Sequence, residues 1–170
     1  MKVDLMIQSL ATGREVIRSL VSGAAVEQAR WKPSPKQWSM LEVINHLADE
    51  EREDFKLRLD ILLHRPKEAW PPLAPEEWVV ERTYNARDPD ESLSRFLAER
   101  ESSLEWLRGL GGVDWTRVRK HPELGPLRAG DFMASWVAHD YLHVRQLAGL
   151  HHAYLGRLCT PFSTDYAGRW

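Results

Sequence analysis

The chain has 170 residues, of which 43% are hydrophobic and 28% are charged. This length predicts a single domain over residues 1–170, and the composition excludes a disordered or fibrous chain. The formal net charge of −2, from 23 basic and 25 acidic residues, leaves no positive surplus to neutralise phosphates. We therefore expect small-molecule partners and no nucleic acid.

Cysteine content and hydropathy indicate the cellular compartment of the protein. Cys159 is the only cysteine, which excludes an internal disulfide and a metal site built from cysteines. The N-terminal stretch is interrupted by Asp4, Arg14 and Glu15, unlike a signal peptide, and no run of about 18 apolar residues occurs. We expect a cytoplasmic protein without a membrane partner.

Four stretches carry apolar residues at helical spacing and predict an all-α, four-helix-bundle fold with long connecting loops. The expected helices cover about 3–21, 39–65, 89–108 and 129–154. In the first helix, Leu5, Ser9, Val16, Ile17, Leu20 and Val21 lie near one face. No paired strands are expected.

Two helix starts have clear sequence signals. Ser39 followed by Glu42 has capping-box spacing, which satisfies two backbone amides at the start of the second helix. Asp88 precedes Pro89, and this order favours a cap and a first turn for the third helix. Between these helices, residues 65–88 hold four prolines and two tryptophans, and we expect them to be irregular or to form at most a short strand or turn.

The last helix carries the candidate chemistry. Its expected inward stripe holds Phe132, Trp136, His139, His143, Gln146, Leu147 and Leu150. His139 and His143 lie four residues apart, so their imidazoles project from adjacent turns of one face and can converge on one ion. His46, flanked by apolar residues of the second helix, also points toward the core.

Three imidazoles from two facing helices suit zinc, nickel or another late divalent ion. Three protein ligands leave one position open for water or substrate, which favours catalysis over a structural site. For each histidine alone, a hydrogen-bonded core side chain is an equally good interpretation.

Two segments resemble the DinB-like (DinB/YfiT) superfamily of small four-helix-bundle metalloproteins. They are WSMLEVINHLADEE, with His46 in its His-Leu-x-Asp, and HDYLHVRQL, with its His-x3-His. The resemblance implies a divalent ion held by His46, His139 and His143. It also implies a thiol-dependent transferase or isomerase that uses a low-molecular-weight thiol.

Several neighbours of the histidines have more than one interpretation. Asp49 and Glu50 follow His46 by about one turn, so one of them can orient a ligand or act as general base, although a solvated helix face is the alternative. Gln146 can hydrogen-bond substrate or fill the bundle. Asp140, about 100° around the helix from His139, is expected to pair with a neighbouring helix.

Four further residues receive simpler interpretations. His64 lies too far along the helix axis from His46 to share an ion. His151 and His152 are expected near the end of the last helix, where the dipole favours a cation. Trp136 is expected in the core.

Three candidate functions follow from the sequence, and we rank them by how well the residues support each. A metal-dependent enzyme that activates a thiol (S-transferase type) or a water molecule comes first, with Glu50 and Gln146 as candidate catalytic residues and a small molecule as substrate. A non-catalytic small-ligand or metal-binding stress-response protein is the alternative, and an interaction module with a vestigial site is a third. A homodimer is expected because helical bundles often pair and eight tryptophans can cover an interface.

Overall fold

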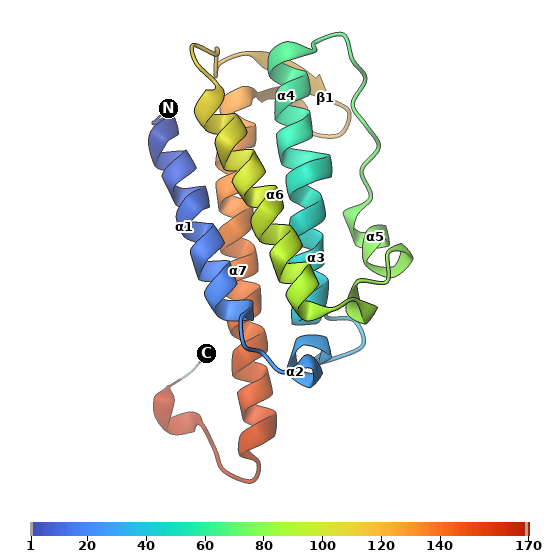
Figure 1. Cartoon of the computed structure of the whole chain (residues 1–170), viewed down its shortest axis with the longest axis vertical. Helices are drawn as coiled ribbons and strands as arrows, with labels where there is room; N and C mark the ends of the chain where they lie inside the picture. The colour runs from blue at the N-terminus through green and yellow to red at the C-terminus, as the bar shows by residue number, and fades with distance from the viewer. Residues whose placement is uncertain (1, 169) are drawn as a thin grey trace.

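The computed structural model describes residues 2–168 and 170. Four long helical rods run side by side in a bundle, and shorter elements flank one end and one side (Figure 1). The long helices are α1 (Val3–Val21), α3 with α4 (Met40–Asp49 and Lys56–His64), α6 (Pro89–Gly109) and α7 (Ala129–Cys159). The expected bundle is thus confirmed. No helix within the described residues is long and apolar enough to cross a membrane.

The rod of α3 and α4 begins where the sequence predicts. Ser39 Oγ accepts a hydrogen bond from the amide of Glu42 at 3.1 Å, and the Glu42 carboxylate accepts one from the amide of Ser39 at 2.8 Å. Between the two α-helical parts, residues Glu50–Phe55 form a π-helical turn. No pattern in the sequence predicts this turn. Such turns insert one extra residue into a helix and are frequent at functional sites.

The start of α6 also follows prediction, whereas the buried face of α1 differs from it. Asp88 caps α6 by accepting hydrogen bonds from the amides of Asp90 and Glu91. In α1 the buried residues are Leu10, Gly13, Ile17 and Val21. The expected face included Leu5 and Val16, which are 49% and 39% exposed.

Segments expected to be irregular contain short regular elements. These elements are α2 (Val26–Arg30), α5 (Pro75–Glu81), the 3-10 turn Tyr84–Ala86, and the strands β1 (Val118–His121) and β2 (Gly125–Arg128). Pro75 occupies the first turn of α5, where its missing N–H costs nothing. The expectation of an irregular 65–88 segment was therefore wrong over 75–81.

The strands form an antiparallel hairpin in the register Val118 to Arg128 and His121 to Gly125, so the expectation of no paired strands was also wrong. Its turn is closed by His121 Nδ1, which accepts hydrogen bonds from the amides of Glu123 and Leu124. Gly125 has φ = 75°, a conformation that glycine adopts without steric cost. Four-residue strands of this kind give almost no alternation signal.

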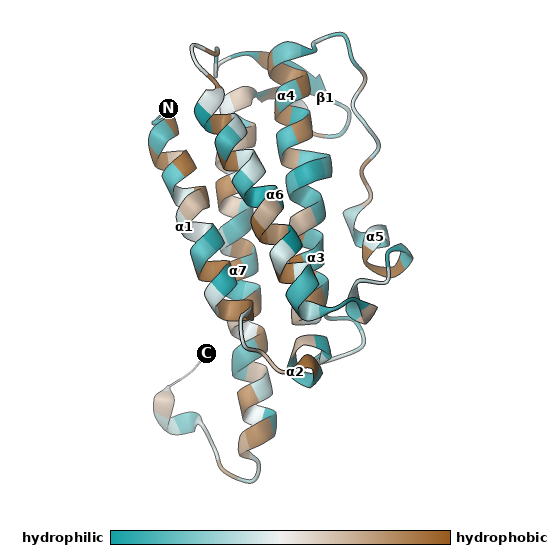
Figure 2. Cartoon of the chain, viewed as in Figure 1, coloured by the Kyte–Doolittle hydropathy of each residue, from teal (hydrophilic) through white to brown (hydrophobic). Residues whose placement is uncertain are grey.

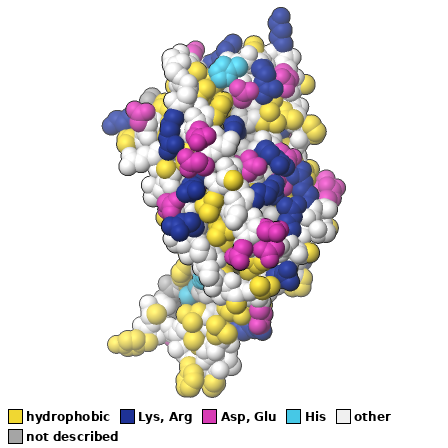
Figure 3. Space-filling view, viewed as in Figure 1, with side chains coloured by type: hydrophobic (Ala, Val, Ile, Leu, Met, Phe, Trp, Pro, Cys, Tyr) yellow, Lys and Arg dark blue, Asp and Glu magenta, His cyan; other side chains and the backbone are white. Residues whose placement is uncertain are grey.

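Helix α7 extends more than one turn past the expected end at Tyr154 and projects beyond the other helices (Figure 1). The chain then bends back through a 3-10 turn, Asp165–Ala167. Large apolar side chains gather on this projecting part, whereas charged side chains dominate the bundle face in the same view (Figure 3). Leu158, Phe162 and Tyr166 are 64%, 80% and 106% exposed.

Two apolar clusters fill the bundle, and the hydropathy colours show apolar residues interleaved with polar ones along each rod (Figure 2). One cluster centres on Leu59, Leu104 and Trp136, near the hairpin. The other centres on Ile17, Ile44 and Phe96, toward α2. Between these clusters the helices bury polar side chains.

One of these buried polar groups is the Arg100 cluster, formed by Arg100, Asp140, Glu51 and Trp136. The Arg100 guanidinium donates to both carboxylate oxygens of Asp140 at 2.6 and 2.7 Å and to Glu51 Oε1 at 2.6 Å. Trp136 Nε1 donates to the same Glu51 oxygen at 2.7 Å. The cluster joins α6, α7 and the π turn, and Arg100 is fully buried.

Candidate metal centre

Helices α3 and α7 bring the three predicted histidines together. His46 comes from α3, and His139 and His143 come from consecutive turns of α7. The Nε2 atom of His139 lies 3.4 Å from that of His46 and 3.1 Å from that of His143. Each of the three offers a nitrogen within 4.8 Å of the other two, and no other such group of metal-ligating side chains occurs among the described residues.

The spacing of the three nitrogens fits one shared ion. Nitrogens about 2.0–2.1 Å from one tetrahedral zinc ion are separated by about 3.3–3.4 Å. The 3.4 Å and 3.1 Å separations are close to this value.

The electrostatics of the histidine triad favour neutral imidazoles. Burial, followed by the neighbouring rings, lowers the pKa of His46 to about 2. Burial, the His143 ring and the Arg100 guanidinium lower the pKa of His139 to about 3. Burial also lowers the pKa of His143. All three rings are therefore neutral near pH 7, which is the state that binds a metal ion.

Side chains around the triad fix the orientation of its rings. His143 Nδ1 donates to Gln146 Oε1 at 2.8 Å, which leaves Nε2 as the nitrogen with a free lone pair. The Trp38 ring lies 4.9 Å from the His46 ring and stacks parallel to His143 at 6.4 Å. Phe55, the last residue of the π turn, packs 5.1 Å from His139.

Glu50 opens the π turn and lies beside the triad. Its Oε1 atom is 3.8 Å from His46 Nδ1, and neither atom has a hydrogen-bond partner. Burial and the adjacent Asp54 carboxyl raise the pKa of Glu50 to about 9. Burial also raises the pKa of Asp54, which forms an ion pair with Arg58 at 2.8 Å. Glu50 is only 4% exposed, so the alternative of a solvated helix face was wrong for it.

Asp49 does not reach the triad and is not solvated either. It is fully buried and accepts hydrogen bonds from Arg82, Arg95 and the hydroxyl of Tyr84. These contacts hold α5 and the following 3-10 turn against α3 and α6. Of the two carboxylates after His46, Glu50 is therefore the one near the site.

The other residues named in the sequence analysis contact protein groups away from the triad. Asp140 pairs with Arg100 of α6, as expected of a residue facing a neighbouring helix. His64 pairs with Asp60 on the surface. His151 contacts the Leu20 carbonyl and the Gln28 side chain. Because α7 continues to Cys159, the expectation that His151 and His152 lie near its end was wrong.

A cavity of about 820 Å³ opens directly onto the triad. Its walls include all three histidines and the aromatic side chains of Trp38 and Trp170. Lys36, Arg145, Gln146 and Glu76 supply polar groups on the same walls. The histidine nitrogens can therefore meet a molecule of substantial size.

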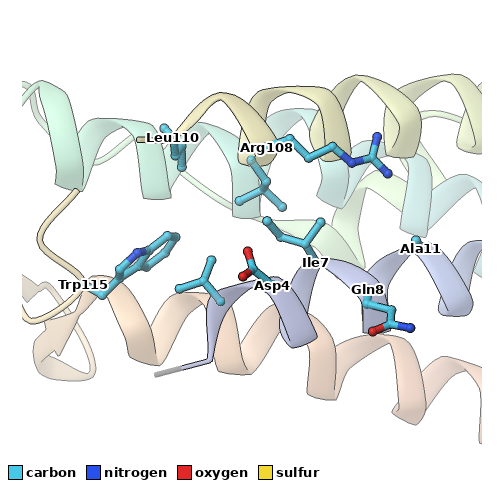
Figure 4. A pocket seen from close by; sticks show the side chains of 9 residues that line it. Asp4, Ile7, Gln8, Ala11, Arg108, Leu110 and Trp115 are labelled. Atoms are coloured by element: carbon cyan, nitrogen blue, oxygen red, sulfur yellow. The ribbon is translucent and has the colours of Figure 1, made fainter. Parts of the chain in front are cut away.

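A second groove, of about 480 Å³, lies between α1 and the end of α6 (Figure 4). Ile7 and Asp4 of α1 lie on one side of it, Arg108 and Leu110 lie on the opposite side, and Trp115 lies at one end (Figure 4). It shares no lining residue with the cavity at the triad. It also offers no cluster of metal-ligating side chains, so we place the candidate chemistry at the triad.

Sequence reasoning missed Trp38, Asp54 and Arg58 as neighbours of the site. Trp38 precedes the helix cap, and only the fold shows that its ring covers two histidines. Asp54 and Arg58 follow Glu50 at four-residue intervals, which is a usable signal for one helix face. The π turn that buries them has no recognisable pattern in a single sequence.

The fold and the triad define a helical bundle with a three-histidine site at an open cavity. The family model of the DinB superfamily matches residues 9–147, and the chain belongs to this superfamily.

Known proteins similar to the chain include one from Oceanobacillus iheyensis and one from Bacillus subtilis. A protein of Oceanobacillus iheyensis named "Putative metal-dependent hydrolase" is 30% identical over 114 residues, which cover 66% of this chain and 64% of that protein. The chain thus matches less than two thirds of that relative's length. YfiT from Bacillus subtilis, whose structure is described as that of "a probable metal-dependent hydrolase with an unusual four-helix bundle topology", is 20% identical. The YfiT match has a TM-score of 0.78 and covers 89% of this chain and 86% of that one.

Proposed function

We propose that this protein is a metal-dependent hydrolase whose divalent ion is held by His46, His139 and His143. The convergence of three neutral imidazole nitrogens on one point of an 820 Å³ cavity is the observation that carries the proposal. The names given to the Oceanobacillus protein and to YfiT support the same reaction class. Zinc, nickel or another late divalent ion suits an all-nitrogen donor set.

A divalent ion bound at the triad supplies Lewis-acid activation of a water molecule or a thiol at neutral pH. Residues of the chain orient the histidine rings and exchange protons with the site. Gln146 holds the His143 ring in the tautomer whose Nε2 lone pair faces the cavity. Glu50, beside His46 and out of contact with bulk water, is placed to orient that ring and to exchange a proton with the site.

Thiol S-transfer is the second candidate. The superfamily resemblance suggests it, and the cavity has room for a thiol and an electrophile side by side. Both reactions use the same three histidines, so the substrate distinguishes them.

The proposed reaction is tested by turnover of nitrophenyl esters by protein loaded with one equivalent of zinc or nickel. We expect hydrolysis that a chelator abolishes, that His139→Ala loses and that the surface variant His64→Ala retains. If turnover occurs only after a small thiol and an alkyl halide are added, the proposed function changes from hydrolysis to thiol transfer. Metal binding without either reaction, across a broad substrate panel, would instead favour the non-catalytic binding protein.

We also propose that the protein acts as a homodimer in the cytoplasm, without nucleic-acid partners. The exposed Leu155 and Leu158 on the projecting end of α7, with Phe162 just after the helix, support self-association, because monomers rarely expose a large apolar patch. The net charge of −2 argues against binding phosphates. Light scattering tests the dimer, and a monomer at all concentrations would refute it.

A further inference from the structure

A separate cavity of about 270 Å³ lies between the π turn, the β-hairpin and the start of α7. Its walls are mostly apolar, with Phe55, Leu73, Leu124, Leu127 and Phe132 among the lining residues. It shares no lining residue with the cavity at the triad, and the proposed reaction makes no use of it.

The walls of this cavity are fixed by packing behind them. Trp70 stacks on Phe132 at 5.8 Å, and its Nε1 donates to the Lys120 carbonyl at 2.8 Å. Phe55 stacks on the buried Trp136 at 5.5 Å. These two aromatic walls need little ordering when a ligand enters, which lowers the cost of binding.

The volume indicates the size of the occupant. An apolar cavity of about 150 Å³ accommodates benzene. A space of 270 Å³ therefore holds one aromatic ring with a short side chain, or an aliphatic group of similar bulk. Ligand sites of this kind combine apolar walls with a few polar groups that orient the molecule.

Charges around the cavity indicate the polar group of the occupant. Asp54 is balanced by Arg58 at 2.8 Å, and Asp131 is balanced by Arg128 at 2.9 Å. Glu123 also lines the cavity, is exposed at the hairpin turn, and has no ion-pair partner among the residues described by the structure. The Glu123 carboxylate thus lacks a counter-charge and lies at the rim of the cavity. A ligand there can keep its charged group partly hydrated while the rest of the molecule is buried.

We propose that this cavity binds a small primary amine with an aromatic or aliphatic body. The body lies between Phe55 and Phe132, and the ammonium group faces Glu123 at the rim. The pocket is distinct from the metal centre, although Phe55 forms part of its wall and also packs 5.1 Å from the His139 ring. An occupant therefore contacts a residue that touches the triad.

The test is ligand-observed NMR on the whole protein with 2-phenylethylamine as the probe. Its neutral and anionic counterparts, 2-phenylethanol and phenylacetate, have the same ring and chain length. We expect saturable binding of the amine with a Kd of about 1 mM or lower, at least about fivefold tighter than the alcohol and with no detectable binding of the acid.

Matched variants locate the binding. Leu124→Trp fills the mouth of the cavity and is expected to abolish amine binding, whereas Leu5→Trp, an exposed leucine on α1 that lines neither cavity, leaves it unchanged. Glu123→Gln is expected to reduce the preference for the amine over the alcohol about fivefold. Because an amine can also ligate a metal ion, the titration is repeated with chelator and with His46→Ala, and binding is expected to persist in both.

Three results would overturn the proposal. Equal binding of all three probes removes the amine assignment. Binding that survives Leu124→Trp places the probe elsewhere, and binding lost with chelator places it on the metal. Absence of saturable binding by any probe up to tens of millimolar rules out the ligand pocket itself.

Discussion

Helix α7 contributes to two buried polar groups that are built in opposite ways. In the Arg100 cluster a guanidinium is surrounded by two carboxylates, and each member makes at least one hydrogen bond of 2.6–2.7 Å. Arg100 Nε and Glu51 Oε2 lack a hydrogen-bond partner, but they belong to groups of opposite charge that pair with each other. In the histidine triad three neutral rings point their nitrogens at one another, and His46 Nδ1 and Glu50 Oε1 lack partners.

The difference separates a structural polar group from a functional one. Opposite charges offset one another in the Arg100 cluster, whereas the three neutral rings of the triad have no such pairing and line an open cavity, which indicates a missing ligand. The Arg100 cluster is closed from solvent by the helices themselves. If the comparison holds, substitutions in it change stability, whereas substitutions in the triad change ligand binding.

The largest expected effect is on the Arg100 cluster. Arg100→Met leaves Asp140 and Glu51 as buried carboxylates without a counter-charge, and we expect a loss of about 3–5 kcal/mol in the free energy of unfolding. Urea denaturation measures it. Arg108→Met, at an arginine whose side chain is 53% exposed on the same helix, is the control and should cost less than about 0.5 kcal/mol. A loss below about 1 kcal/mol for Arg100→Met would contradict the claim that the Arg100 cluster stabilises the fold.

The next effect concerns the approach of α1 to the same cluster. A Cβ atom on Gly13 would lie 2.4 Å from Asp140 Oδ2, whereas one on Gly109 would meet nothing within 4 Å. We expect Gly13→Ala to destabilise the protein by about 1–3 kcal/mol because α1 must move outward. Gly109→Ala, the matched control in α6, should leave stability unchanged or raise it slightly. Equal melting temperatures for the two variants would contradict the close contact.

A smaller effect is expected when the triad loses its supporting hydrogen bond. Gln146→Ala removes the acceptor of His143 Nδ1, and loss of such supporting contacts lowers metal affinity about 10–100-fold. Competition with a chromophoric chelator measures the affinity. Gln37→Ala, another glutamine that lines the cavity, serves as the control. Unchanged affinity in Gln146→Ala would show that this glutamine only fills space.

The last expected effect is a pH dependence of the metal-free protein. The pKa of His46 is about 2 in the fold and near 6.5 when unfolded, so below pH 6.5 the unfolded chain binds a proton that the native state does not. Stability is therefore lost as pH falls from 6.5, by about 1.4 kcal/mol per pH unit for this group. His46→Gln should flatten the slope between about pH 4 and 6 by that amount, and an unchanged slope would contradict the neutral, buried ring.

Local sequence signals predicted the long helices well. The Ser39–Glu42 box and the Asp88–Pro89 start are decided by neighbouring residues, and the structure places both as expected. The four-residue spacing of His139 and His143 is local too. Their meeting with His46 was accessible because apolar periodicity showed which faces turn inward, and the superfamily resemblance pointed to the same residues.

The π turn, the buried face of α1 and the hairpin depend on tertiary contacts that cannot be read from a single sequence. The π turn at Glu50–Phe55 changes the helical register without glycine or proline, so the sequence left a solvated face open for Glu50 and gave no reason to single out Asp54. Leu10 and Gly13 form the buried face of α1 because Arg100 and Asp140 lie opposite them, which no pattern within α1 reveals. The hairpin strands are too short to show alternation.

The most direct test of the account is the metal content of untagged protein, measured by mass spectrometry for the parent chain and for His46→Ala, His139→Ala and His64→Ala. The account predicts about one zinc or nickel ion per chain in the parent and in His64→Ala, and none in the two triad variants, with all four proteins folded. Equal metal content in the parent and the triad variants, or no uptake by the parent after incubation with either ion, would contradict it.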